Sequence, residues 1–239
     1  MLDITENNFW EQDIQPWCNW ARKEIPAFFQ QNRQRANADG SLPAHTVDLS
    51  NNGLSDVGLH AILQVFHALN LTVKVFKLYN NKIGRGGAYA LADWIEKCLV
   101  ALLELHLSDN YIPVEGGAVI FEAIANNLAY PPEKRGFGNV PLWLRLERNL
   151  IDEPDEFTRV AEELMKNTRP TAKVICLVRR REVFGCKTNR CCFASKDGSC
   201  PVVHLCYCGN QKPMHTALPR EARAWNDAAG EGELERWSV

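Results

Sequence analysis

Residues 47–54, Val-Asp-Leu-Ser-Asn-Asn-Gly-Leu, contain a pattern that returns three more times along the chain. The four copies are Val47-x-Leu49-x-x-Asn52-x-Leu54, Phe76-x-Leu78-x-x-Asn81-x-Ile83, Leu105-x-Leu107-x-x-Asn110-x-Ile112 and Leu144-x-Leu146-x-x-Asn149-x-Ile151. Apolar residues two positions apart predict a short strand with one face inward. The amide of the Asn carries both donors and acceptors, so it can satisfy backbone groups where the chain turns inside a stack.

The spacing of the Asn residues indicates a repeat architecture. Asn52, Asn81 and Asn110 lie 29 residues apart, and a constant period of this length is typical of solenoids. Asn149 follows 39 residues after Asn110, which is one period plus an insertion of about ten residues. Such an array is a scaffold that holds partners, so the repeat favours binding over chemistry.

A glycine recurs six residues after each of the first three Asn residues, at Gly58, Gly87 and Gly116. The apolar spacing around these glycines predicts helices, and a Gly inside a helix costs about 1 kcal/mol relative to Ala. A repeated Gly therefore predicts a close approach of helix to strand. The fourth repeat has Asp155 at this position, so we expect its helix to sit differently or further out.

The pattern Leu-x-x-Leu-x-Leu-x-x-Asn-x-Leu, with a helix that begins near a Gly, resembles the ribonuclease-inhibitor-type leucine-rich repeat. That class also occurs in Nod-like receptors and in the Ran GTPase-activating protein. The resemblance implies an α/β fold: a short leucine-rich-repeat solenoid of four to five strand-helix repeats with a curved parallel sheet. Pro141 departs from the pattern where the fourth repeat should open with an aliphatic residue. Arg180 stands where a fifth Asn would follow a strand over 174–178.

Composition divides the chain into four parts. We expect an N-terminal helical cap and linker in residues 1–43, the repeats in 44–178, a small basic Cys-rich unit in 179–212 and a flexible tail in 213–239. Pro16 and Pro26 each suit a first helical turn, which favours two short helices over one. These helices would cover the inner layer of the first repeat, and a separate docking helix is the alternative.

Strand residues that alternate with the buried ones must face the concave side of the sheet. We predict a protein-protein interaction scaffold that binds its partner there, through Lys77, Tyr79, Glu104, His106, Trp143, Arg145 and Glu147. Aromatic residues and Arg are the types that anchor interfaces. The alternative is a solvated face whose opposite charges pair across neighbouring strands. Residues at the same position of neighbouring strands form a row across this face. If residues 174–178 form the next strand, Val174 belongs to the row of Trp143, and Cys176 belongs to the row of Arg145.

The insertion at residues 128–141 is rich in turn formers and is a further candidate for recognition. Its aromatic residues, Tyr130 and Phe137, would be exposed unless they fold back over the strand ends.

The second informative segment is Cys186-x4-Cys191-Cys192-x7-Cys200-x3-His204-x-Cys206-x-Cys208. An extended backbone would place His204, Cys206 and Cys208 on one side and apolar residues on the other. Thiolates and imidazole are zinc ligands. We predict one structural Zn²⁺, with candidate ligands Cys186, Cys191, Cys200, His204, Cys206 and Cys208. Unmetallated buried thiols and disulfides remain open alternatives.

Positive charge surrounds the same segment. Residues 164–212 hold ten Lys or Arg against Glu182 and Asp197, so this segment carries +8 and the remainder −10, within a total of −2. The alternative function is therefore nucleic-acid binding through a zinc-finger-like C-terminal segment. A simpler explanation is that Arg179, Arg180 and Arg181 end an exposed sheet edge, where charge blocks strand pairing.

No constellation in the sequence points to catalysis, so we expect a non-enzymatic protein. The run Gly84-Arg-Gly-Gly87 lacks the Lys-Ser/Thr of a phosphate-binding loop. The polar N-terminal stretch does not look like a secretory signal, and no stretch is long and apolar enough for a membrane span. We therefore expect an intracellular protein, cytoplasmic or nuclear, without membrane contact.

The zinc prediction has a direct measurement. Metal analysis of reduced, purified protein should find about one equivalent of zinc, since one four-ligand site fits the ligand count. Less than half an equivalent, with all six clustered cysteines freely alkylated and folding unchanged by chelator, would leave only the buried-thiol interpretation.

Overall fold

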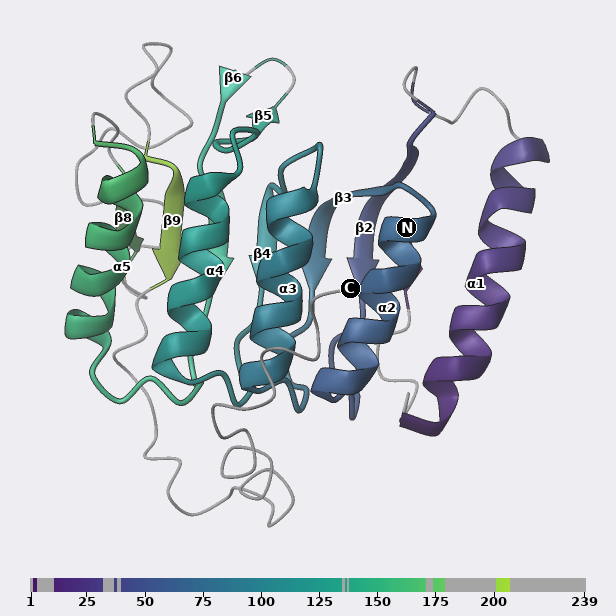
Figure 1. Cartoon of the computed structure of the whole chain (residues 1–239), viewed down its shortest axis with the longest axis horizontal. Helices are drawn as coiled ribbons and strands as arrows, with labels where there is room; N and C mark the ends of the chain where they lie inside the picture. The colour runs from purple at the N-terminus through teal and green to yellow at the C-terminus, as the bar shows by residue number, and fades with distance from the viewer. Residues whose placement is uncertain are drawn as a thin grey trace.

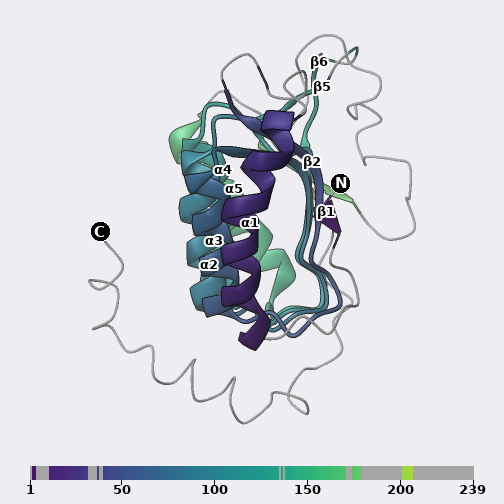
Figure 2. The same ribbon diagram turned by 90° about the vertical axis from the view of Figure 1, so that its right-hand side faces the viewer.

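The computed structural model describes residues 2–3, 11–31, 37, 40–134, 136, 138–170, 174–178 and 201–206. These residues form an α/β structure with a seven-stranded parallel sheet in the order β1-β2-β3-β4-β7-β9-β8. The five helices lie on one face of this sheet (Figure 1, Figure 2). The predicted tail of residues 213–239 and most of residues 179–212 lie outside the described part.

The main-sheet strands are β1 (Leu2–Asp3), β2 (Leu42–Asp48), β3 (Leu71–Lys77), β4 (Glu104–His106), β7 (Leu142–Arg145), β8 (Ile175–Val178) and β9 (Val203–Cys206). The helices are α1 (Glu11–Gln31), α2 (Asp56–Ala68), α3 (Arg85–Lys97), α4 (Val114–Asn126) and α5 (Pro154–Thr168). A separate antiparallel hairpin joins β5 (Glu133–Lys134) to β6 (Gly138–Asn139).

The first apolar residue of each repeat aligns across the sheet. Val47 pairs with Phe76, Phe76 with Leu105, and Leu105 with Leu144, all between adjacent parallel strands. All four side chains are fully buried beneath the helices. The predicted register of these four segments is therefore confirmed.

The repeated Asn has the role that the sequence predicted. The Asn110 side chain accepts a hydrogen bond from the backbone N–H of Ile83 at 3.1 Å. It donates to the carbonyls of Leu78 at 2.9 Å and Leu107 at 3.1 Å. The Asn of the repeat before and the Asn of the repeat after make the equivalent bonds. Because the bonded groups belong to two successive repeats, each amide ties its own turn to the preceding one.

The residue before each repeated Asn adopts a left-handed backbone. The φ angles are 56° at Asn51, 54° at Asn80, 59° at Asp109 and 57° at Arg148. Asn and Asp tolerate this region, whereas Arg rarely occupies it. Arg148 is held there in part by its ion pair with Asp109 of the preceding repeat.

The recurring glycines mark close packing, as predicted. A Cβ on Gly87 would lie 2.7 Å from Cγ2 of Ile83 and 2.7 Å from Oδ1 of Asp56. A Cβ on Gly58 or on Gly116 would likewise contact the last apolar residue of its own turn and a side chain of the preceding helix. The close approach is therefore to the end of the turn and to the neighbouring helix together, which sets the spacing between helices.

The N-terminal helix differs from the sequence prediction. α1 runs unbroken through Pro16 and Pro26, so the expectation of two short helices is wrong. Ile14, Cys18 and Ala21 form a buried stripe at helical spacing. Burial of this stripe holds the helix together across two positions where Pro removes a backbone donor.

The C-terminal end of the sheet does not follow chain order. β9 pairs in parallel with both β7 and β8 and lies between them, so the expectation that 174–178 lies beside 142–145 is wrong. Both inward residues of β9, Val203 and Leu205, are fully buried, which suits an inner strand, whereas Leu177 of the edge strand β8 is only half-buried. Part of the predicted Cys-rich unit thus belongs to the main sheet.

Replacing a repeat Asn should cost far more stability than replacing an exposed one. Asn110→Ala leaves buried donor and acceptor groups of two repeats unsatisfied, so we expect it to lower the free energy of unfolding by about 2–4 kcal/mol. Asn126→Ala is the matched control, because the Asn126 side chain is exposed and, among the described residues, bonds only Glu96. Urea denaturation measures both, and equal losses for the two variants would contradict the proposed role of the buried amide.

Candidate functional site

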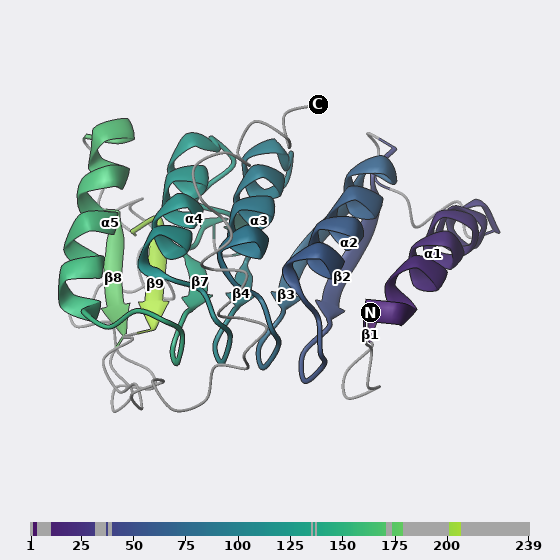
Figure 3. The same ribbon diagram turned by 60° about the horizontal axis from the view of Figure 1, so that its bottom comes forward.

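The helices cover one face of the sheet (Figure 2, Figure 3). The predicted binding residues lie on the opposite face, which we call the open face. Register places Glu104 beside Trp143, and places Lys77 beside His106, which in turn lies beside Arg145. Tyr79 and Glu147 follow β3 and β7, two residues beyond Lys77 and Arg145. The structure thus places five of the seven predicted partner-binding residues on the neighbouring strands β3, β4 and β7, and the other two, Tyr79 and Glu147, just beyond the ends of β3 and β7.

The two open-face rows end differently from the expectation. His204, not Val174, continues the row of Trp143, and Cys206, not Cys176, continues the row of Arg145. Cys176 lies next to His204 instead. The cause is the inner position of β9, which moves the last strand one place outward.

The charged side chains of the open face pair with one another. The pairs are Lys77 Nζ with Asp48 Oδ2 at 2.9 Å, His106 Nε2 with Glu104 Oε2 at 3.1 Å, and Arg145 Nη2 with Glu147 Oε1 at 3.0 Å. The first pair joins the neighbouring strands β2 and β3, the second lies within β4, and the third joins the last residue of β7 to a residue just beyond it. The pairing that the sequence analysis named as the alternative to a partner surface is therefore present. A partner would meet charges that already have counter-ions.

Asp48 is the most enclosed carboxylate of these pairs, with a residue exposure of 7%. Burial alone would raise its pKa, but hydrogen bonds from Ser50 and Lys77 outweigh burial and hold the pKa below its usual value. The pKa of Glu104 is also lowered, first by its hydrogen bond with His106 and further by nearby Lys134.

Trp143 is a large aromatic side chain of this surface and lies on β7. It is half-buried, and its ring centroid lies 6.0 Å from that of His204 on the neighbouring strand. His204 itself is 2% exposed, although it faces away from the helices. The indole therefore rests against a fixed neighbour and keeps part of its surface available.

The insertion loop folds back onto the protein at its start. Tyr130 is 2% exposed, and its hydroxyl accepts a hydrogen bond from the backbone N–H of Leu102 at 3.2 Å. The Arg169 guanidinium donates to carbonyls of this turn, including that of Tyr130 at 2.7 Å. Of the two options for Tyr130, folding back is therefore the correct one, whereas Phe137 lies outside the described residues. The β5–β6 hairpin lies at the end of the sheet where the strands begin (Figure 1).

Two of the six predicted zinc ligands can be placed. His204 and Cys206 lie on the open side of β9 and Val203 and Leu205 on the helix side, as the alternation predicted. Cys186, Cys191, Cys200 and Cys208 lie outside the described residues, as do Arg179, Arg180 and Arg181. Within the described part, no three metal-ligating side chains gather.

The cysteines within the described part differ in state. Burial raises the pKa of the Cys206 thiol to about 12, with Glu147 nearby adding to the shift. Cys18 and Cys98 are free thiols. Cys176 is disulfide-bonded.

The glycine-rich turn before α3 holds a carboxylate of the protein itself. The backbone N–H of Gly84 donates to Asp56 Oδ1 at 2.6 Å, and the N–H groups of Gly86 and Gly87 also face this carboxylate. Burial raises the pKa of Asp56, and the three N–H groups oppose that rise. The position where a phosphate would sit in a phosphate-binding loop is taken by Asp56, consistent with the sequence analysis.

The Asp48 pair has a predicted pH dependence. Because the folded pKa of Asp48 lies below its unfolded value of about 3.9, the carboxylate adds stability above that value and loses it as pH falls through the folded pKa. We expect Asp48→Asn to destabilise the protein at pH 7 and the difference from wild type to shrink below about pH 4. Urea denaturation across pH measures this. Asp93→Asn, which removes one partner of an exposed pair with Lys97, should have little effect at any pH. An Asp48→Asn deficit that stays constant from neutral to acid pH would contradict the assignment.

No protein-family model matches the chain, and no curated protein matches it. Among solved structures, the chain is similar to one described as Leiomodin-1 Actin-Binding Site 2 (ABS2). The sequence identity is 14% and the TM-score 0.33, over 59% of this chain and 87% of that chain. A match at this level supports no statement about function. Within the described residues, no helix combines the length and apolar character needed to cross a membrane.

Proposed function

We propose that this chain is a short leucine-rich-repeat protein of the ribonuclease-inhibitor type, and that its open face binds a protein partner. Three features support the repeat class: parallel strands with aligned apolar residues, a buried Asn that bonds the preceding repeat, and a glycine that seats each of the first three repeat helices. The open face is the surface that such an array presents to partners.

The position of Trp143 carries the proposal. Its indole is half-buried on β7, between Glu104 of β4 and His204 of β9 in register. An aromatic side chain that is already ordered loses little conformational entropy when a partner covers it, and Trp is enriched among residues that dominate binding energy. Tyr79, also half-buried, provides a second aromatic contact two strands away.

The ion pairs suggest how the binding energy is divided. Lys77 and Arg145 already have counter-ions, and Glu104 is already hydrogen-bonded to His106. A partner therefore gains little net energy from these groups and uses them to set its orientation. Most of the affinity should come from apolar contact with Trp143. We therefore expect an affinity that changes only weakly with salt, in contrast to the steep dependence of nucleic-acid binding through a basic segment.

The structural zinc in residues 186–208 remains a separate proposal. Its two described candidates, His204 and Cys206, border the open face, so a metal there would fix the edge of the partner surface rather than supply chemistry.

Removing Trp143 should release the partner. We expect Trp143→Ala to reduce partner recovery in quantitative affinity purification by about tenfold or more, because buried aromatic anchors are worth about 2 kcal/mol or more. Trp20→Ala is the matched control, because Trp20 lies on α1, away from the open face, and is 49% exposed.

Circular dichroism confirms that each variant folds, and Tyr79→Ala serves as a second open-face variant should the loss of the His204 contact destabilise Trp143→Ala. A partner recovered equally with the Trp143, Tyr79 and Trp20 variants does not bind the open face, and the proposal fails for it.

A further inference from the structure

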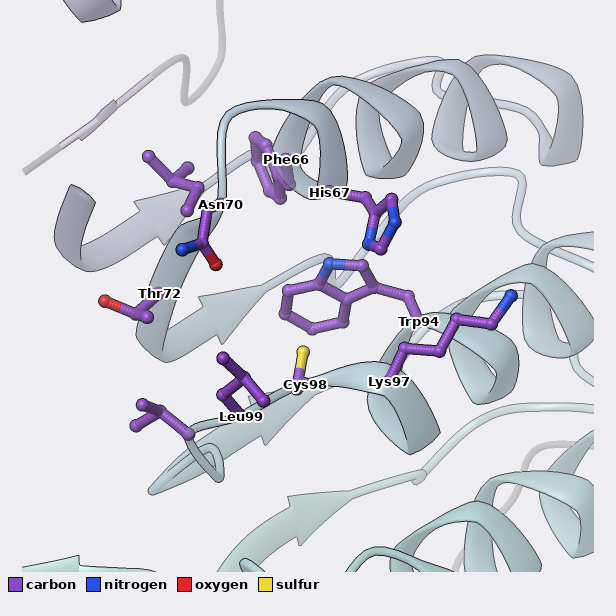
Figure 4. A pocket seen from close by; sticks show the side chains of 10 residues that line it. Phe66, His67, Asn70, Thr72, Trp94, Lys97, Cys98 and Leu99 are labelled. Carbon is purple, nitrogen blue, oxygen red and sulfur yellow. The ribbon is translucent and has the colours of Figure 1, made fainter. Parts of the chain in front are cut away.

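Two features of the described protein lie apart from the seven open-face residues. One is a cavity of about 280 Å³ beside Trp94, between the C-terminal ends of α2 and α3 (Figure 4). None of the described residues that line this cavity indicates what would occupy it. The other is the turn at residues 51–54, after β2, which contains the one Asn-Gly pair of the sequence, Asn52-Gly53.

The first turn of the array lacks a hydrogen bond that the later turns have. In each later repeat, the backbone N–H of the residue after the Asn donates to a carbonyl of the preceding repeat. These bonds run from Lys82 to Leu54 at 2.9 Å, from Tyr111 to Ile83 at 2.8 Å and from Leu150 to Ile112 at 2.9 Å. Only β1 and α1 come before the first repeat. Among the described residues, the N–H of Gly53 accordingly has no carbonyl partner.

The Asn52 side chain is also less enclosed than its counterparts. It is half-buried, whereas the Asn side chains of the three later repeats are at most 6% exposed. Its Nδ2 donates to the carbonyls of Leu49 and Ser50, each at 3.1 Å. The next residue, Gly53, has no Cβ that would shield its backbone nitrogen. Both water and this nitrogen can therefore approach the Asn52 amide.

We propose that Asn52 is a site of spontaneous chemical modification, at which water converts the side-chain amide to a carboxylate. The backbone nitrogen of Gly53 gives up its proton and attacks Cγ of Asn52. The new carbon–nitrogen bond closes a succinimide ring, and the side-chain nitrogen takes up a proton and leaves as ammonia. Water then adds to one of the two ring carbonyls and opens the ring, which leaves Asp or isoaspartate at position 52.

The modification changes the turn that ends the first strand. A carboxylate has no proton to donate, so the hydrogen bonds from position 52 to the carbonyls of Leu49 and Ser50 are lost. The backbone N–H of Ser50 donates to Asp48 Oδ1 at 3.2 Å, so the same turn holds a carboxylate of the open face. Deamidation therefore loosens the N-terminal end of the array and adds a negative charge there. This inference does not depend on the partner proposed for the open face.

The test ages the full chain at mildly alkaline pH and samples it over time. Peptide mapping by mass spectrometry measures deamidation at each Asn, and an isoaspartyl methyltransferase with labelled S-adenosylmethionine measures isoaspartate. We expect product at Asn52 first, at a rate within a few-fold of its rate in urea, because the folded turn leaves the attack open. Asn81 and Asn110 should stay intact while the protein is folded.

Two variants separate the effect of position from that of sequence. Gly53→Ala should slow the reaction at Asn52 about tenfold, because a Cβ crowds the attacking nitrogen. Later repeats hold Lys82, Tyr111 and Leu150 at this position, so the turn accepts a side chain. Lys82→Gly is the matched control, because it creates the same dipeptide at the buried Asn81. Its Asn81 should react at least several-fold more slowly than Asn52.

Two results would overturn the proposal. The first is an Asn52 that stays intact in the folded protein and reacts in urea, which would mean that the folded turn blocks the attack. The second is an equal rate at Asn52 and at Asn81 of the folded Lys82→Gly variant, which would mean that the dipeptide alone sets the reactivity. Circular dichroism confirms that each sample is folded, and the comparison of wild type with and without urea needs no variant.

Discussion

The buried side-chain amide of one Asn per repeat is the interaction on which the rest of the structure depends. At Asn110 this amide replaces the backbone partners that Ile83, Leu78 and Leu107 cannot find inside the stack. Water cannot substitute easily, since Asn110 is 1% exposed. The amides of Asn81, Asn110 and Asn149 bond the preceding repeat as well as their own, so the distance between these strands and the register of the sheet follow from them. The open face exists because successive strands are locked in this register.

The same stacking determines how charge is distributed. With the strands in register, acidic and basic side chains of the open face fall within hydrogen-bond distance. Lys77 on β3, for example, reaches Asp48 on the neighbouring strand β2. Beyond the strands, Arg148 and Asp109 repeat this arrangement at two left-handed positions. A surface of this kind has little unpaired charge within the described residues. The partner binding that we propose for this face would therefore rest on shape and on aromatic contact, above all with Trp143.

The helix layer leaves a different kind of surface. Glycines hold the N-terminal ends of the helices close to their neighbours, as Gly87 does against Asp56. The C-terminal ends of α2 and α3 lack such contacts and instead frame a cavity around Trp94. Tight packing at one end and a cavity at the other follow from the same repeat.

The sequence by itself determined the strands, their alignment, the role of the Asn and the close-packing glycines, because these depend on short periods within one repeat. Period two also placed the seven open-face residues together, and set His204 and Cys206 on one side of their strand. Tertiary structure alone decided the rest. The inner position of β9 depends on competition between segments far apart in sequence. The burial of Tyr130 depends on the backbone N–H of Leu102, which donates a hydrogen bond to its hydroxyl. Continuity of α1 through two prolines depends on the burial of its stripe. The pairing of open-face charges and the cavity at Trp94 depend on distances between repeats, and no local pattern encodes those distances.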